Sequence, residues 1–240
     1  MIRGEQATLV TLNRMGRATR DLTEYSREFV LFAPLARGPV LDIGAGFGVA
    51  TLSAAAAGAS VIANDVDNRH LQIIVEQATN AGLVERLSTR LSRFPTDLHF
   101  PSQSLGAIHA SQVLHFLSGS ELMTGAALMF RWLQPGGKVF TVTATPYVKT
   151  LERFIPVYEE RKRAGIPWPG VVHNVHEYSS HPTIDELPDF MHFLDHETVA
   201  RPFAAAGFVI EKVEMYNRQG LPDYLKYDGR ENVGLIARKP

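Results

Sequence analysis

The stretch VLDIGAGFGVATL, residues 40–52, decides the fold of this 240-residue chain. Its first four residues are three apolar side chains and one acid, Asp42, and they predict a short buried strand. A loop with three glycines follows, and the alanine-rich sequence after it predicts a helix that ends near Gly58. A strand, a glycine loop and a helix in this order form a ligand site in wound parallel sheets.

The spacing of the glycines indicates the kind of ligand. A dinucleotide loop needs glycine at its first, third and sixth positions. These positions hold Gly44, Gly46 and Val49, because the third glycine, Gly48, comes one place early. A P-loop is excluded because no Gly-Lys-Ser/Thr follows. Asp42 is badly placed for pyrophosphate but can accept hydrogen bonds from a cationic or hydroxyl-bearing ligand.

A second acid supports a nucleoside ligand. Asp65 ends the next predicted strand, residues 60–65, roughly 20 residues after the loop, where an acid commonly accepts hydrogen bonds from ribose hydroxyls. The sequence therefore predicts a nucleoside site without a pyrophosphate.

Strands and helices alternate outward from this motif. Further strands are predicted at residues 86–94, 105–114, 138–145, 209–216 and 232–240, with helices between the earlier ones. The pattern predicts an α/β fold: a Rossmann-like, doubly wound, mostly parallel seven-stranded sheet with an antiparallel edge hairpin.

Two segments flank or interrupt this pattern within a single domain, residues 1–240. Residues 1–37 are expected to form an N-terminal helical segment, in which Tyr25 lies on an apolar stripe. Residues 146–194 hold six of the 14 prolines together with several aromatic residues, which predicts an inserted substrate cap after the fifth strand. The acidic excess of residues 146–200, nine Asp/Glu against five Lys/Arg, favours a neutral or cationic substrate.

Composition limits the partners and the location. The net charge is −1 and no basic stripe appears, which disfavours nucleic acid as a partner. No apolar run is long enough to cross a membrane, and no signal peptide is evident. With no cysteine in the chain, we expect a cytoplasmic protein without disulfides or zinc–thiolate sites.

Four ordered blocks carry a family resemblance: VLDIGAGFG (40–48), VIANDVD (61–67), HFPSQSLGAIHASQVLHFL (99–117) and LQPGGKVFTVT (133–143). Over residues 38–145 the sequence resembles class I S-adenosylmethionine-dependent methyltransferases. The resemblance implies S-adenosyl-L-methionine as the cofactor and a small-molecule acceptor as the partner. The aromatic residues of the predicted cap favour an aromatic or apolar acceptor. A homodimer is left open, and neither a membrane nor a nucleic-acid partner is expected.

The resemblance also implies which residues hold the cofactor. Gly44, Ala45 and Gly46 lie against its methionyl part and ribose, Asp42 supports its amino end, and Asp65 takes the ribose hydroxyls. Val66 and Phe94 pack near adenine, and Tyr25 closes over the cofactor. The remaining residues expected at the cofactor site are Arg93, Ser111, Gln112 and Val113.

Histidines are the candidate catalytic residues. His115 follows the fourth strand, and His173 and His176 lie in the predicted cap. Histidine titrates near neutrality and can take a proton from an acceptor. No metal site is predicted, because spacing within an irregular segment does not bring ligands together.

The leading hypothesis is methyl transfer to an oxygen or nitrogen of a small molecule. The alternatives are methylation of a protein or peptide side chain, a non-catalytic cofactor-binding scaffold subunit, and a nicotinamide oxidoreductase. A largely closed aromatic pocket would favour a small acceptor, and an open groove would favour a protein.

Overall fold

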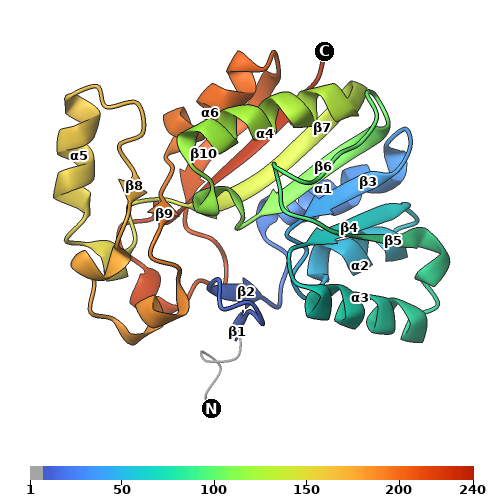
Figure 1. Cartoon of the computed structure of the whole chain (residues 1–240), viewed down its shortest axis with the longest axis horizontal. Helices are drawn as coiled ribbons and strands as arrows, with labels where there is room; N and C mark the ends of the chain where they lie inside the picture. Colours follow the sequence, from blue (N-terminus) through green and yellow to red (C-terminus); the bar gives the residue numbers. More distant parts are fainter. Residues whose placement is uncertain (1–7) are drawn as a thin grey trace.

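A seven-stranded sheet forms the centre of the molecule in the computed structural model, which describes residues 8–240 (Figure 1). Its strands are β3 (Val40–Ile43), β4 (Val61–Asp65), β5 (Leu87–Leu91), β6 (Leu105–Ser111), β7 (Leu133–Ala144), β10 (Val209–Tyr216) and β11 (Asn232–Arg238). Their order across the sheet is β10-β11-β7-β6-β3-β4-β5.

The first five of these strands in the chain are parallel, and β11 runs antiparallel to both β7 and β10. The predicted mostly parallel sheet is therefore confirmed, and the predicted hairpin at its edge is the β10–β11 pair. The strand order reverses on either side of β3, which pairs with β4 on one side and with β6 on the other. Ligands of wound sheets bind at the carboxyl ends of the strands at such a reversal.

Helices cover both faces of the sheet. They are α1 (Glu24–Phe32), α2 (Val49–Ala56), α3 (Asn68–Asn80), α4 (Gly119–Trp132) and α6 (His196–Ala205), whereas α5 (Ile155–Arg163) lies in the segment that follows β7. Neighbouring residues of β3 point to opposite faces: Val40 packs with residues of α1 and α2, whereas Leu41 packs with Trp132 and Phe203 of α4 and α6. Because both faces are buried, the central strands are apolar almost throughout.

Side-chain caps fix the starts of the helices that follow the strands. Ser118 and Glu121 form a capping box at α4, Asp67 caps α3, and Asp195 caps α6. Each oxygen satisfies backbone N–H groups that have no partner inside the helix. These caps were readable from the sequence because they depend on residues three or fewer positions apart.

The N-terminal segment differs from the prediction of a helical segment over residues 1–37. Residues 1–7 lie outside the described residues, and a hairpin of β1 (Thr8–Val10) and β2 (Arg17–Thr19) precedes α1. Its turn places Arg14 and Gly16 at positive φ, a backbone conformation that ends regular structure. Helix formation is confirmed only over α1.

The segment between β7 and α6 has its own small core. It contains α5 and the short antiparallel pair β8 (Val171–Val172) and β9 (Met191–His192), joined by turns. Ten buried residues pack together there: Tyr147, Val148, Leu151, Phe154, Tyr158, Val172, Val175, Ile184, Met191 and Phe193. Figure 1 shows this segment beside the sheet, next to the β1–β2 hairpin.

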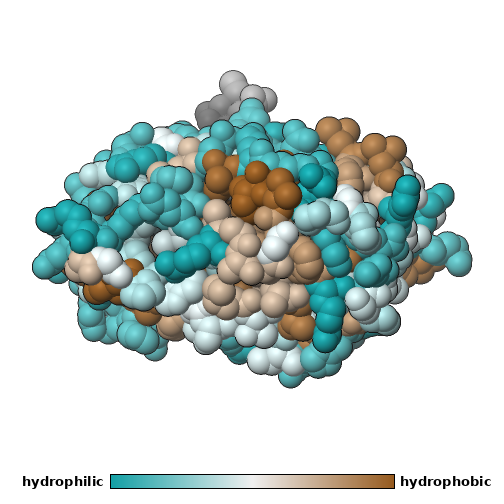
Figure 2. All heavy atoms as spheres, turned by 90° about the horizontal axis from the view of Figure 1, so that it is seen from above, coloured by the Kyte–Doolittle hydropathy of each residue, from teal (hydrophilic) through white to brown (hydrophobic). Residues whose placement is uncertain are grey.

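The face of the molecule shown in Figure 2 is mostly hydrophilic, with hydrophobic residues in separate groups. None of the helices in residues 8–240 combines the length and the apolar character needed to span a bilayer.

Candidate active site

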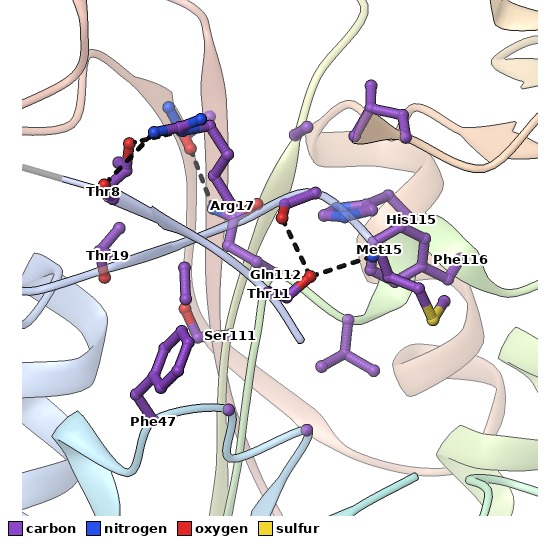
Figure 3. Close-up of a pocket in the computed structure, with 18 of the residues that line it drawn as sticks. Thr8, Thr11, Met15, Arg17, Thr19, Phe47, Ser111, Gln112, His115 and Phe116 are labelled. Carbon is purple, nitrogen blue, oxygen red and sulfur yellow. Dashed lines mark hydrogen bonds between the residues drawn. The ribbon is translucent and has the colours of Figure 1, made fainter. Parts of the chain in front are cut away.

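A cavity of about 540 Å³ lies at the carboxyl ends of β3, β4 and β6. Four parts of the chain line it: the ends of these strands with the glycine loop, the β1–β2 hairpin, the 146–194 segment and the loop between β10 and β11. Figure 3 shows part of its lining, with hairpin residues Thr11, Met15 and Arg17 drawn around the same cavity as Ser111, Gln112 and His115.

The three glycines of the loop all have positive φ angles, but they differ in the space that a Cβ would have. Gly44 has φ 66°, and a Cβ on it would lie 2.4 Å from Cγ2 of Val113. Gly48 has φ 80°, and a Cβ there would lie 2.7 Å from Ile74 of α3. Gly46 has φ 53°, but the nearest atoms to its Cβ position are 4.0 Å away. Gly44 and Gly48 therefore allow the loop to pack, whereas Gly46 leaves open space on the cavity side.

Asp65 lies beside this open space and is held in a fixed orientation. Its Oδ2 accepts a hydrogen bond from the Gly46 N–H (2.9 Å), and its Oδ1 accepts one from the Asp67 N–H (2.9 Å). His70 Nε2 accepts the Leu12 N–H (3.0 Å), so its proton is on Nδ1, 3.2 Å from Asp65 Oδ1. The carboxylate is thus oriented toward the glycine loop, as the prediction for Asp65 requires.

Asp42 is part of a buried hydrogen-bond chain. Its Oδ2 accepts from Thr51 Oγ1 (2.6 Å), and its Oδ1 lies 2.7 Å from His109 Nδ1. His109 Nε2 in turn lies 2.9 Å from Ser26 Oγ of α1. Asp42 lines the cavity, and its contacts with Thr51 and His109 fix the glycine loop to α2 and β6. His109 was not predicted, because nothing local marks a histidine inside a strand.

The other residues expected near the cofactor also line the cavity, with one exception. Those that line it are Gly44, Ala45, Gly46, Val66, Arg93, Phe94, Ser111, Gln112 and Val113. Phe94 is buried and packs edge-on against Trp132, while Arg93 donates to Glu121.

Tyr25 is the exception. It does not line the cavity, is 1 % exposed, and packs over β11, where a Cβ on Gly234 would lie 2.0 Å from its ring. Its hydroxyl donates to Glu214 (3.2 Å), and burial together with this carboxylate raises its pKa. The structure corrects the expected closing role of Tyr25: the residue belongs to the core between α1 and the sheet.

Of the three candidate catalytic histidines, one lines the cavity and two do not. His115 lines the cavity, and its Nδ1 lies 2.9 Å from Thr143 Oγ1. Burial lowers the pKa of His115 to about 3, so its ring is neutral at physiological pH. His173 and His176 are exposed and do not line the cavity, and His176 lies 3.6 Å from Asp185. The structure does not bring these two histidines to the site.

The β1–β2 hairpin is a part of the site that sequence reasoning missed. Arg17 forms an ion pair with Glu186 (2.9 Å), and the Gly16 N–H donates to the Glu186 carbonyl (2.7 Å). On its other side the hairpin binds His70 through Leu12. It therefore bridges the glycine-loop side of the cavity and the 146–194 segment.

The loop between β10 and β11 was also missed. It brings Leu221, Leu225 and Glu231 to the cavity, more than 100 residues along the chain from the glycine loop. Glu231 is 1 % exposed, and its Oε1 accepts the N–H groups of Tyr227 (2.7 Å) and Gly229 (2.9 Å). Its Oε2 is buried and has no hydrogen-bond partner within residues 8–240. The only sign of this loop's role in the sequence was an acid, Glu231, directly before the predicted last strand.

The described residues contain no group of three or more His, Asp or Glu arranged to hold a metal ion. The cavity instead combines a glycine loop, an oriented acid and an apolar wall.

Comparison with known proteins identifies this arrangement. Residues 40–137 match a family model described as "Methyltransferase domain". No curated protein matches the sequence.

Several solved structures share the fold. Geranyl diphosphate C-methyltransferase from Streptomyces coelicolor A3(2), determined with Mg²⁺, geranyl diphosphate and S-adenosyl-L-homocysteine, is 16 % identical and superposes with a TM-score of 0.60 over 89 % of this chain and 79 % of its own. An S-adenosylmethionine-dependent methyltransferase from Mesorhizobium loti is 18 % identical, with a TM-score of 0.61 over 89 % and 95 % of the two chains. A further methyltransferase of this type, from Methanosarcina mazei, is 18 % identical, with a TM-score of 0.61 over 84 % and 92 %.

At these sequence identities the solved structures establish the fold alone. The family model identifies residues 40–137 as a methyltransferase domain. The matched residues include the glycine loop after β3 and Asp65 at the end of β4. Residues 40–137 thus match a methyltransferase domain, and the chain as a whole has the fold of S-adenosylmethionine-dependent methyltransferases.

Proposed function

We propose that this protein transfers a methyl group from S-adenosyl-L-methionine to an oxygen or nitrogen atom of a small molecule. The observation that carries the proposal is one continuous cavity, in which the glycine loop and Asp65 lie at one side and an apolar wall at the other. The bound cofactor supplies an electrophilic methyl group on a sulfonium, so the protein has to position a nucleophile and exclude water.

The residues at the loop fit this cofactor. Gly46 leaves open space beside the carboxylate of Asp65, which is oriented by two backbone N–H groups and can accept hydrogen bonds from ribose hydroxyls. Gly44 and Ala45 would contact the methionyl part and the ribose, and Val66 and Phe94 the adenine.

The apolar wall fits a small acceptor. It is built by side chains of the 146–194 segment and of the β10–β11 loop, namely Val148, Leu151, Ile184, Leu187, Met191, Phe193, Leu221, Pro222 and Leu225. Burying apolar area of a ligand against such a wall is favourable by about 25 cal/mol per Å². We therefore propose residues 146–194 as the substrate cap.

Glu231 is the best-placed group to take a proton from the acceptor. One carboxylate oxygen is fixed by two N–H groups, and the other has no partner within residues 8–240. The next residue, Asn232, accepts a hydrogen bond from Gln112 (3.2 Å) at the end of β6. Oε2 of Glu231 would accept the proton that the acceptor's oxygen or nitrogen loses on methylation, and S-adenosyl-L-homocysteine would be the leaving group. The lowered pKa of His115 makes that ring a weaker base.

The same geometry weighs against the alternatives. A protein or peptide side chain needs an open groove, whereas the hairpin is tied to both sides of this cavity. A scaffold subunit has no need for a buried carboxylate oxygen facing an apolar cavity. The methylated atom of the C-methyltransferase neighbour does not transfer to this chain at 16 % identity.

The test is an isothermal titration with S-adenosyl-L-homocysteine, and separately with NADH. We expect the first to bind with micromolar affinity and the second not to bind. Asp65→Ala should weaken binding of the first compound at least tenfold, through loss of two charge-assisted hydrogen bonds. Asp97→Ala, which removes an exposed acid away from the cavity, is the matched control and should leave it unchanged. Absence of binding by the wild-type protein at millimolar concentration would refute the proposal.

A further inference from the structure

Arg218, at the start of the β10–β11 loop, has a buried guanidinium group without a hydrogen-bond partner among residues 8–240. It is 7 % exposed and lines the cavity. Its Nε and Nη1 are both buried, and neither has a partner within the part of the chain that the structure describes, residues 8–240. A buried guanidinium is costly unless a carboxylate, phosphate or other acceptor binds it.

The groups that face Arg218 do not complete its hydrogen bonding. Glu24, Tyr216 and Tyr224 are the ionisable side chains whose charges act on it, and burial lowers its pKa despite them. Glu24 has its Oε1 engaged by the Gln219 N–H (3.3 Å), and no carboxylate among residues 8–240 lies within 4.0 Å of the guanidinium. Glu24 therefore offsets part of the charge from a distance without binding it.

The other arginines of the cavity differ in this respect. Arg17 is paired with Glu186 (2.9 Å) and Arg93 with Glu121 (3.1 Å). Both are structural pairs that need nothing from a ligand. Arg218 has donors to spare and opens onto the cavity beside the apolar residues Leu221 and Pro222 of its own loop.

We infer that Arg218 binds an anionic oxygen group, a carboxylate or a phosphate, on the acceptor. This inference rests on the proposed function and narrows it: the acceptor has an apolar body, which lies against the cap, and one anionic end. A guanidinium binds either group through two parallel hydrogen bonds. Its fixed position would set the distance between the anionic end and the atom that receives the methyl group.

The acidic excess of residues 146–200 favoured a neutral or cationic acceptor in the sequence analysis. The positions of these acids in the structure do not support that expectation. None of the nine acids of this stretch lines the cavity. The two charged residues of the β10–β11 loop that line the cavity, Arg218 and Glu231, both lie outside the stretch.

The test compares three probes with the same phenylpropyl body in protein saturated with S-adenosyl-L-homocysteine: 4-phenylbutyrate, its neutral amide, and 3-phenylpropyl phosphate. Binding is measured by isothermal titration. We expect at least one anionic probe to bind at least tenfold more tightly than the amide, and the comparison of carboxylate with phosphate identifies the preferred group. Arg218→Met should remove the difference, and Arg218→Lys should retain part of it.

Two arginine variants serve as controls. Arg131→Met removes an exposed arginine of α4 away from the cavity and should keep the preference for the anion. Arg17→Met tests the paired arginine of the cavity, and loss of the preference in this variant but not in Arg218→Met would overturn the inference.

The outcomes separate the two proposals. Failure of S-adenosyl-L-homocysteine to bind the wild-type protein would refute the proposed function. If it binds, equal affinity for amide and anions, or no binding of either anion at millimolar concentration, would refute the role of Arg218 alone. Retained binding of S-adenosyl-L-homocysteine shows that a variant is folded. If Arg218→Met fails to fold, Arg218→Lys and Arg17→Met decide the assignment: a preference unchanged in Arg218→Lys and lost in Arg17→Met would overturn it.

Discussion

At the residue scale, the site depends on a few side chains whose surroundings are incomplete without a ligand. A Cβ on Gly46 would lie 4.0 Å from its nearest neighbours, Ala18 and the Gly44 carbonyl, and Glu231 and Arg218 have buried polar atoms without partners in residues 8–240. Asp42 and His109, in contrast, are fully engaged with protein groups.

Gly46→Ala is expected to weaken binding of S-adenosyl-L-homocysteine at least tenfold, because a methyl group enters the space beside Asp65. The substitution also costs about 1 kcal/mol of folding free energy, since alanine is strained at a φ of 53°. Gly82→Ala is the matched control: its φ is 69° and its Cβ meets nothing within 4 Å. The control should lose similar stability in thermal melts yet bind as tightly as wild type in titrations. Equal loss of affinity in both variants would show that strain, and not occupied space, is responsible.

Glu231→Gln is expected to lower kcat by about 10²–10⁴-fold for any acceptor that the wild-type protein methylates, the usual contribution of a general base. The Kd of S-adenosyl-L-homocysteine should stay within threefold, because Glu231 lies outside the glycine loop. The variant's rate should rise with pH as the acceptor loses its proton to solvent. A wild-type kcat in the variant, measured by product mass, would exclude Glu231 as the base.

At the element scale, the β1–β2 hairpin holds the cavity together by tying α3 to the 146–194 segment. Leu12 binds His70 on one side, and Arg17 binds Glu186 on the other. Neither strand of the hairpin was predicted, because each has three residues and contacts elements far along the chain. The predicted closing element, α1, instead packs its aromatic residues into the core.

Arg17→Met is expected to speed the dissociation of S-adenosyl-L-homocysteine by about two- to fivefold. The ion pair is partly exposed, so it is worth about 0.5–1 kcal/mol. In a double-mutant cycle, Glu186→Gln should add little to Arg17→Met, because either change breaks the same contact. Dissociation rates come from stopped-flow displacement, with the exposed Arg20→Met as control. Additive effects would mean that the pair does not hold the hairpin closed.

At the scale of the whole molecule, stability should fall in mild acid, because buried histidines cannot be protonated without cost. His192 is fully buried, and its Nδ1 donates to the Leu117 carbonyl (2.9 Å). Burial lowers its pKa from 6.5 to about 4. The unfolded chain binds a proton below pH 6.5 and the folded chain does not, so this stability is present above pH 6.5 and is lost as the pH falls toward 4.

The difference amounts to about 3 kcal/mol for His192 alone, at 1.36 kcal/mol per pKa unit. His192→Asn keeps a donor for Leu117 and removes the titration, so its unfolding free energy should fall less between pH 7 and pH 4. Urea unfolding at several pH values measures this, and the exposed His99→Asn should behave as wild type. An equal fall in His192→Asn and wild type would contradict the assignment. His115, whose pKa burial lowers to about 3, should keep part of the acid sensitivity in both proteins.

The sequence by itself determined the sheet, the helix caps, the glycine loop and Asp65. These features depend on interactions between neighbours in the chain: apolar runs of strands, cap residues next to the N–H groups they bind, and glycines where φ is positive. Only the tertiary structure decided what Tyr25, His173 and His176 face, and that Arg17, Arg218 and Glu231 meet at one cavity. An aromatic residue on a helix stripe or a lone charged residue has the same local pattern in a core, on a surface or at a site. The physical reason is that burial and lost hydrogen-bond partners arise between segments more than 100 residues apart, which no local pattern records.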